Sequence, residues 1–549
     1  MKSRKIIFSS LLVLLFTFTA CELDFKPENV IKGEDVTADN FDAMIAPMYN
    51  LYWSAFNDKF GYGLGDGMAF NVSAPGTKHI APYYSLSVTG LSDGLQEAWN
   101  AFYIIIQQAN KVIQDIKNNS TVSDEEKNPL VAEARFMRGL AYWHLVSLWE
   151  DVIISENVGA LIENPIVNVN KQKDVYEFAI RDMEYAAKYL PETSKATGRV
   201  NRYSAFGMLS RFYLAYSGFV ASNYGENRNC GARDPEYLNL AEKAAEKVIT
   251  NSAYHLMDNY ADLFKIEFNN NAESLFAFQW VPGSSDQVGW GVTNSTQRFF
   301  ACSPDITGGD DAWGYYTYCP YNMISEYELN DTIRRKATWM GNGDYYPELN
   351  KANGGFTYTL STSVLNVKKG VTGSSKDNPA IGHQNSALDN YMLRLAEVYL
   401  NYAEAVLGNN ASTSDETALY YFNEVRRRAV MPIKSSITWE DIRHERRIEF
   451  CMEGRYWYDL VARAYYKQQE VINYINAQDR GKDPAFTFTA PNDLQLNPNN
   501  SGTTTVVSTA GTGTFKLPYP AGDLMKNPKM KEPPVSYTFT EERITDLFN

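Results

Sequence analysis

Three carboxylates at a regular spacing are the first residues that could do chemistry. Glu445, Glu449 and Glu453 recur every four residues, so on a helix they would share one face. Paired carboxylates are the acid and base of glycoside hydrolases. Arginines are interleaved with these glutamates, however, and further arginines occupy 426–428. Because charged groups on otherwise apolar helices are buried only when they are paired, we expect a structural network of ion pairs.

Other catalytic and metal-binding motifs are incomplete. His444 and Glu445 lack the second histidine of a zinc-protease helix, and no Gly-x-Ser-x-Gly segment occurs. The alternating glycines at 61–67 fit neither a dinucleotide loop nor a phosphate loop. With five His and no C-x-x-C pair, a structural zinc site is not expected. The sequence therefore predicts no enzyme, no metal and no cofactor.

Aromatic residues outside helical patterns are the second group of candidates. They are denser between Trp280 and Tyr321 than the chain average of 14%. A rigid ring offers a flat apolar face, and Tyr and Trp add a polar group, which suits the C–H faces and hydroxyls of sugars. The alternative is that these rings only fix the loop to its scaffold. The candidate ligand-binding residues are Trp290, Trp313, Tyr315 and Tyr316 with Asn294, Asp310 and Asp311 as polar partners, and the secondary candidates are Phe70, Asn71, Tyr83 and Tyr84.

The elements that must position these residues are mostly helices. Apolar residues recur at helical spacing, and Ser123 with Glu126 forms a capping box at one helix start. We expect a strand at 273–280 and loop from 479 onward, with loops dominating 251–390. On the apolar helices we expect His144 and Cys451 to be core residues. The predicted helices are 95–117, 123–149, 173–190, 202–218, 236–250, 391–407, 415–428 and 438–474.

Composition and the N-terminus set the class of protein. The 549 residues are 44% hydrophobic and 21% charged, as in globular proteins, and the net charge of −14 argues against nucleic-acid binding. The basic residues Lys2, Arg4 and Lys5 precede an apolar run at 6–20, which is typical of an export signal and short for a membrane span. The run ends at Cys21 and resembles the lipobox of bacterial lipoproteins. In an exported chain, Cys302 and Cys319 could form a disulfide.

Six segments spread along most of the mature chain carry distinctive motifs. They are CELDFKP (21–27), AEARFMRGLAYWHLVSLWEDV (132–152), LRLAEVYLNYAEA (393–405), FNEVRRRA (422–429), HERRIEFCMEGRYWYDLVAR (444–463) and LPYPAGDLMKNPKM (517–530). Together and in this order, these segments resemble the SusD/RagB family of surface lipoproteins. The match departs from the family pattern at Arg455, which comes one place early, and at Tyr519, where Ile is common.

The resemblance implies a mainly α fold, with four irregular tetratricopeptide-type helix pairs and a loop-rich, minor-β ligand-binding region. It divides the chain into a signal peptide (1–20), an N-terminal helical region (21–225) and a C-terminal region (226–549) with a variable insert at about 251–390. It implies a lipoprotein anchored in the outer membrane through lipid on Cys21, which binds a glycan or oligosaccharide and delivers it to a SusC-like TonB-dependent transporter. A peptide-binding RagB-like receptor and, less favoured, a surface glycoside hydrolase are the alternatives.

Overall fold

Helices form most of the part of the chain that the computed structural model describes, which is residues 38–75, 77–157, 159–280, 294–309, 312–382, 385–482, 486–487, 497–498 and 506–548. The capping box predicted at Ser123 and Glu126 is present at the start of its helix. The helices of the scaffold are α2 (Ala38–Ile45), α3 (Ala81–Tyr84), α4 (Leu95–Asn118), α5 (Asp124–Trp149), α6 (Ala160–Glu163), α7 (Gln172–Tyr189), α8 (Arg202–Ala221), α9 (Pro235–Asn251), α14 (Leu395–Leu407), α15 (Glu416–Arg428), α16 (Trp439–Glu449), α17 (Tyr456–Asn476) and α18 (Ala521–Lys526).

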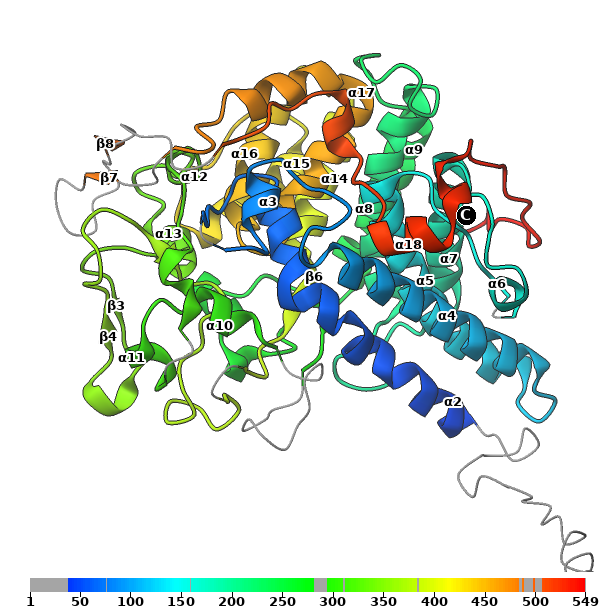
Figure 1. Ribbon diagram of the computed structural model, residues 1–549, viewed down its shortest axis with the longest axis horizontal. Helices are drawn as coiled ribbons and strands as arrows, with labels where there is room; N and C mark the ends of the chain where they lie inside the picture. The colour runs from blue at the N-terminus through cyan, green and yellow to red at the C-terminus, as the bar shows by residue number, and fades with distance from the viewer. Residues whose placement is uncertain are drawn as a thin grey trace, which may run out of the picture.

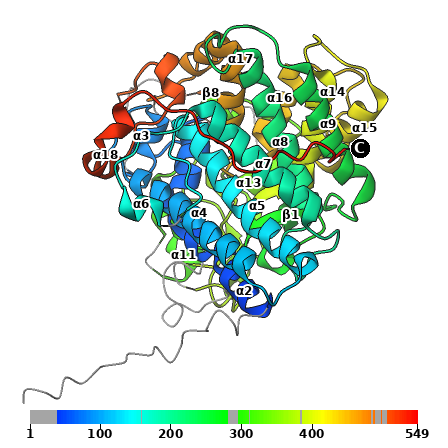
Figure 2. The ribbon, with the colours of Figure 1, turned by 90° about the vertical axis from the view of Figure 1, so that its right-hand side faces the viewer.

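Successive helices pack against one another in a series. Helix α4 packs on α5, α5 on α7, α7 on α8 and α8 on α9, and α14 then packs on α9 and α15. Figure 2 shows α4, α5, α7 and α8 side by side as one layer. Their apolar side chains form one continuous core. Burial of these side chains stabilises the helices more than intrinsic helix propensity does. The predicted fold class, a mainly α scaffold of tetratricopeptide-type helix pairs with a minor β part, is confirmed.

Most of the segment between α9 and α14 forms a second body of short elements, at the left of Figure 1, whereas its strands β1 and β6 pack into the core of the helices. It has its own apolar core, which also receives residues from the chain around α3. Its strands pair in twos and antiparallel, β1 with β6, β2 with β5 and β3 with β4. The elements are β1 (Ser274–Phe278), α10 (Thr296–Phe300), α11 (Pro304–Thr307), η8 (Trp313–Tyr316), α12 (Tyr321–Ile324), α13 (Thr332–Thr338), β2 (Trp339–Met340), β3 (Tyr345–Tyr346), β4 (Phe356–Thr357), β5 (Asn366–Val367) and β6 (Asn390–Arg394); β7 (Phe486–Thr487) and β8 (Asn497–Pro498) pair further along the chain.

Two helix predictions were wrong at points where tertiary contacts act. Residues 390–394 form β6 because they pair with β1, so the helix begins at Leu395. The predicted helix at 438–474 is two helices, since Met452 and Gly454 adopt positive φ angles of 63° and 71° between α16 and α17. The tail predicted as loop contains the short helix α18.

Buried polar and sulfur-containing residues follow the sequence predictions in part. His144 is buried, and its Nδ1 lies 2.8 Å from the hydroxyl of Tyr458. Cys451 is a core residue, as predicted. Cys302 and Cys319 are buried in the same core as free thiols, so the structure does not contain the disulfide considered from the sequence. Among the described helices, none combines the length and apolar character that a membrane span needs.

Candidate functional site

Three aromatic side chains are exposed on one turn of 3-10 helix, η8. The exposed fractions are 51% for Trp313, 44% for Tyr315 and 61% for Tyr316. The rings of Tyr315 and Tyr316 meet edge to face, with centroids 5.0 Å apart and an angle of 87° between their planes. We call these three residues the aromatic shelf. Clustered exposed rings of this kind mark binding surfaces, and Tyr and Trp add polar groups for a sugar hydroxyl.

Helix α10 supports Trp313 from behind. The Phe299 ring meets the Trp313 ring edge to face with centroids 5.8 Å apart. The Arg298 guanidinium lies 5.2 Å from the centroid of Trp313 and 4.6 Å from that of Phe299, within cation–π range. Arg298 and Phe299 are buried, so they fix the indole while half of its surface faces solvent. Sequence reasoning did not identify Arg298, because no motif marks it.

The backbone of the shelf is fixed by close packing and by a buried amide. Gly314 N–H donates to the Ala301 carbonyl (2.8 Å), and a Cβ at position 314 would come within 2.2 Å of the Phe300 carbonyl oxygen. The Asn366 side chain, on β5, donates to carbonyl oxygens of Gly314, Tyr315 and Thr317. Asn366 was also missed from the sequence, because nothing local connects it with residues some fifty positions earlier.

The predicted polar partners are not assembled at the shelf. Asn294 is buried, its side-chain amide donates to the Leu388 carbonyl (2.8 Å), and its Oδ1 accepts from Thr296 N–H (2.9 Å). Both ends of that side chain are therefore used inside the fold, which corrects its prediction as a ligand-binding residue. Trp290, Asp310, Asp311 and the predicted lipid attachment site Cys21 lie outside the described residues.

The secondary candidates are core residues, and their prediction as a surface site is corrected. Phe70 stacks on Tyr84 with centroids 6.3 Å apart, and both are buried. Tyr83 is fully buried and donates to the Asp93 carbonyl (2.9 Å). Asn71 accepts from Arg447 Nε (3.0 Å). Gly63 and Gly67, in the glycine-rich chain at 61–67, pack against Tyr83 here.

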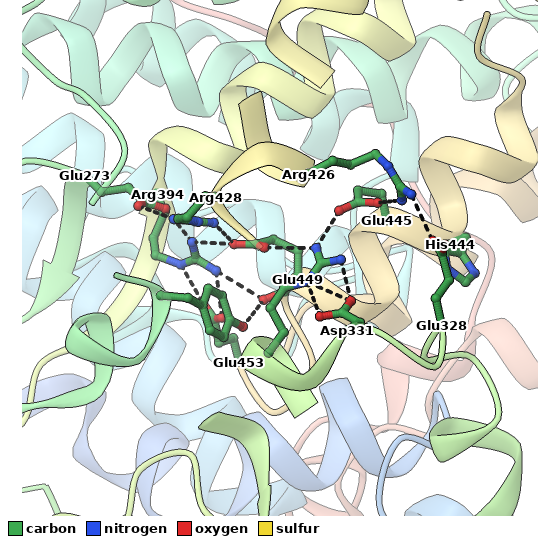
Figure 3. A network of polar contacts seen from close by, with 12 residues as sticks. Glu273, Glu328, Asp331, Arg394, Arg426, Arg428, His444, Glu445, Glu449 and Glu453 are labelled. Atoms are coloured by element: carbon green, nitrogen blue, oxygen red, sulfur yellow. Dashed lines mark hydrogen bonds and ion pairs between the residues drawn. The ribbon is translucent and has the colours of Figure 1, made fainter. Parts of the chain in front are cut away.

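The glutamates at helical spacing belong to the predicted ion-pair network (Figure 3). Arg394 bridges Glu273 (2.5 Å), Glu449 (3.0 Å) and Glu453 (2.8 Å). The network continues through Arg428 to Glu449 and through Arg334 to Glu445, and Arg426 joins Glu445 (2.8 Å). The network connects α13, α15, α16 and β6, so we interpret it as structural.

The electrostatics of this network do not suit acid–base catalysis. Burial would raise the pKa of Glu449, but Arg428, Arg394 and Arg334 outweigh burial and lower that pKa to about 2. Burial likewise opposes the lowered pKa of Glu453, which Arg394 and Lys369 produce. Glu445 and Glu449 have no exposed surface. A general acid needs a raised pKa, which Glu449 and Glu453 lack, and access to substrate, which the fully buried Glu445 and Glu449 lack.

A large groove lies away from the shelf. This groove of about 630 Å³ runs between residues 192–203 and 270–277. The amides of Asn201, Asn270 and Asn271 line it, but each already bonds within the protein, to Tyr254, Gln279 and Tyr391 respectively. Within the described residues, no three His, Cys, Asp or Glu side chains group as a metal site requires. The aromatic shelf is therefore the best candidate site.

Comparison with known proteins identifies the family. The model of the SusD family matches residues 310–535, and the model described as "Starch-binding associating with outer membrane" matches residues 70–214. A SusD-like protein of Bacteroides ovatus is 38% identical over 563 aligned positions, which cover 98% of this chain and 99% of that protein. This chain therefore belongs to the SusD family, as its motifs predicted.

Solved structures agree with this assignment. A structure determined with xylogluco-oligosaccharide is 38% identical, has a TM-score of 0.83, and is matched over 91% of this chain and 100% of that chain. A SusD superfamily protein from Parabacteroides distasonis has a TM-score of 0.69 at 20% identity, over 90% of this chain and 98% of that chain. The second likeness shows the shared fold alone.

Proposed function

We propose that the protein is a cell-surface lipoprotein that binds an oligosaccharide and delivers it to a SusC-like TonB-dependent transporter of the outer membrane. The observation that carries the proposal is the aromatic shelf, where three neighbouring rings remain exposed although most aromatic side chains of the chain are buried. The xylogluco-oligosaccharide seen with a 38% identical relative supports a sugar ligand. In this proposal the insert at about 251–390 carries the ligand site.

Binding without turnover distinguishes this function from its alternatives. The full mature chain from Cys21 is titrated calorimetrically with xylogluco-oligosaccharide, malto-oligosaccharide and a mixed peptide pool, and the sugars are analysed for cleavage. Saturable binding of an oligosaccharide that is recovered intact supports the proposal. Binding of peptides alone favours the RagB-like receptor, and cleavage of the sugar favours the hydrolase.

The anchor is tested by changing its attachment residue. Cys21→Ser removes the thiol that carries the lipid, and several acyl chains are needed for stable membrane attachment. We expect the variant to leave the outer-membrane fraction, measured by immunoblotting of separated membranes. Cys230→Ser, at a partly exposed free thiol, is the matched control and stays membrane-bound. Membrane-bound Cys21→Ser protein would contradict the anchor.

The transporter is tested in the same membranes. We expect a TonB-dependent transporter, identified by mass spectrometry, to co-purify with the wild-type lipoprotein after mild solubilisation. Loss of oligosaccharide uptake when either gene is deleted would support the delivery step. Unchanged uptake without the lipoprotein would contradict it.

A further inference from the structure

One buried amide lies directly beneath the aromatic shelf. The side-chain nitrogen of Asn366 is 3.1 Å from the Gly314 oxygen, 3.1 Å from the Tyr315 oxygen and 3.0 Å from the Thr317 oxygen. Asn366 is 1% exposed, so water does not compete for these bonds. Two N–H groups shared among three carbonyls fix the whole turn of η8 rather than one residue of it.

The orientation of this amide is fixed from its other end. The Tyr358 hydroxyl donates to Asn366 Oδ1 at 2.6 Å, and Tyr358 is fully buried. With the amide reversed, its oxygen would face three carbonyl oxygens, so only one orientation satisfies the site. The backbone of Asn366 is held as well, because β5 pairs with β2 and forms a bridge with Tyr318.

These contacts define a role in binding. We propose that Asn366 is the positioning residue of the aromatic shelf, holding η8 in the one conformation that presents Trp313, Tyr315 and Tyr316 to a ligand. Asn366 itself touches no ligand, since it is buried below the turn. Its effect is preorganisation: a turn that is already ordered loses less conformational entropy when the ligand binds. The role in affinity rests on the proposed function, whereas the role in ordering η8 does not.

The sharpest variant is Asn366→Asp, which keeps the size and the oxygen that accepts from Tyr358. Its second oxygen has no hydrogen to donate while the acid is ionised, and it repels the three carbonyls. Burial raises the pKa of such a carboxyl, so the acid regains one O–H donor as the pH falls. We expect affinity for xylogluco-oligosaccharide or malto-oligosaccharide, whichever the wild type binds, to be about tenfold weaker at pH 8. We expect part of this loss to be recovered at pH 5.

Two further variants distinguish a local effect at η8 from a general folding defect. Tyr358→Phe keeps the ring and removes only the hydroxyl that orients the amide, so we expect a smaller loss of affinity in the same direction. Asn353→Asp makes the same chemical change at an exposed turn and is the matched control, with affinity like that of the wild type at both pH values.

Hydrogen exchange of the segment 312–319 gives a readout without ligand. We expect faster exchange there in Asn366→Asp and Tyr358→Phe, with the rest of the chain unchanged. Unchanged exchange and affinity in both variants would overturn the inference, and so would exchange that rises equally throughout the molecule. If the wild type binds no oligosaccharide, the proposed function fails, and the exchange data alone confirm or overturn the positioning role.

Discussion

Trp313 shows how a single ring is both anchored and exposed. One side of its indole packs against Arg298 and Phe299, while 51% of its surface faces solvent. The rings of Tyr315 and Tyr316 are perpendicular, so one face of a sugar ring could stack on only one of them at a time. If the shelf binds a sugar, we therefore expect its three residues to contribute unequally to the affinity.

Removal of a shelf ring is expected to weaken binding without unfolding the protein. If a sugar covers roughly 50 Å² of ring, at about 25 cal/mol/Å², the contact contributes about 1 kcal/mol. Trp313→Ala and Tyr316→Ala should then each lose roughly fivefold in oligosaccharide affinity by calorimetry. The Tm should barely change, because these side chains are about half exposed.

Tyr420→Ala is the matched control for the shelf variants, since this tyrosine is 53% exposed on α15. Its affinity should equal that of the wild type. A fall in Tm that parallels the fall in affinity in the shelf variants would instead make the rings structural.

At the scale of elements, a close approach of two backbones joins the N-terminal glycines to the α16–α17 junction. A Cβ on Gly65, in the π-helical turn η5 (Gly63–Gly67), would lie 2.3 Å from the Gly454 backbone. The neighbouring Asp66 carboxylate accepts from Met452 N–H (2.9 Å) and Gly454 N–H (2.7 Å). Burial nevertheless raises the pKa of Asp66 to about 6. The spacing of glycines that fits no phosphate loop thus serves packing.

Gly65→Ala is therefore expected to destabilise the fold. The added methyl group meets backbone that cannot move aside, so we expect a loss of about 2–3 kcal/mol in the free energy of unfolding. Urea denaturation measures this change. Gly513→Ala is the matched control, because a Cβ there meets nothing within 4 Å. Equal stability of the two variants would show that the junction is not tightly packed.

The ion-pair network is a second connection between elements, and it predicts a stability loss. Arg394→Met removes a cation that pairs with three buried carboxylates, those of Glu273, Glu449 and Glu453. We therefore expect the free energy of unfolding to fall by about 3–5 kcal/mol. Arg427→Met breaks an exposed ion pair with Glu424 and should lower the free energy of unfolding by less than about 1 kcal/mol. Urea denaturation at pH 7 compares the two, and similar losses would contradict a buried network.

The same network predicts how stability depends on pH. The pKa of Glu449 is about 2 in the folded protein, against about 4.3 in the unfolded chain. The contribution of the Glu449 carboxylate to the free energy of unfolding is therefore complete above about pH 4.3, and it is lost as the pH falls toward 2. We expect Glu449→Gln to be less stable than the wild type at pH 7, with a difference that narrows below pH 4. A constant difference across urea melts at pH 7, 5 and 3 would contradict this.

At the scale of the whole molecule, the C-terminus crosses the N-terminal helices. Figure 2 shows the red C-terminal trace running over the layer of α5, α7 and α8. We call residues 533–548 the C-terminal strap. Val535 N–H donates to the Val169 carbonyl (2.9 Å), and Phe548 packs near Phe206 with ring centroids 5.9 Å apart. Arg543 bonds to Glu184 at 2.6 Å. The strap thus ties the C-terminal end of the described chain to α7 and α8.

Loss of the strap contact is expected to weaken the N-terminal helices. Glu184 is 2% exposed, and Arg543 is its charged partner among the described residues, so Arg543→Met leaves a buried carboxylate without a cation, with the Tyr213 hydroxyl still donating to it (2.7 Å). We expect the free energy of unfolding, measured by urea denaturation, to fall by about 2–4 kcal/mol. This loss is smaller than for a fully buried ion pair because Arg543 is partly exposed. Asp546→Asn, which breaks the exposed pair with Lys188, should lose at most about 1 kcal/mol. Equal losses would contradict a specific role for Arg543.

Much of the fold could be predicted because its signals are local. The capping box of Ser123 and Glu126 and the apolar spacing of the long helices lie within a few residues of sequence. The prediction failed at β6, which is a strand only because β1 lies beside it. The prediction that the network glutamates pair with arginines was correct. Arg334, which pairs with Glu445, was not identified from the sequence.

The candidate site could be predicted only in part. Trp313, Tyr315 and Tyr316 were identified from the density of rings in a segment without helical periodicity, and whether they bind a ligand stays a prediction. Phe70, Tyr83 and Tyr84 are aromatic too but are buried, Phe70 and Tyr84 in the second core and Tyr83 in the core of the helices. Composition cannot distinguish these two outcomes.

The sequence by itself determined the family, the helical scaffold and the pairing of charge on the apolar helices, because these depend on motifs and short-range spacing. The tertiary structure alone decided which rings face solvent, which amide holds them and which helices the C-terminal strap contacts. Those properties depend on surfaces brought together from distant segments, such as Asn366 beneath η8 and Arg543 beside Glu184. Burial is a property of the packed molecule, and no single segment encodes it.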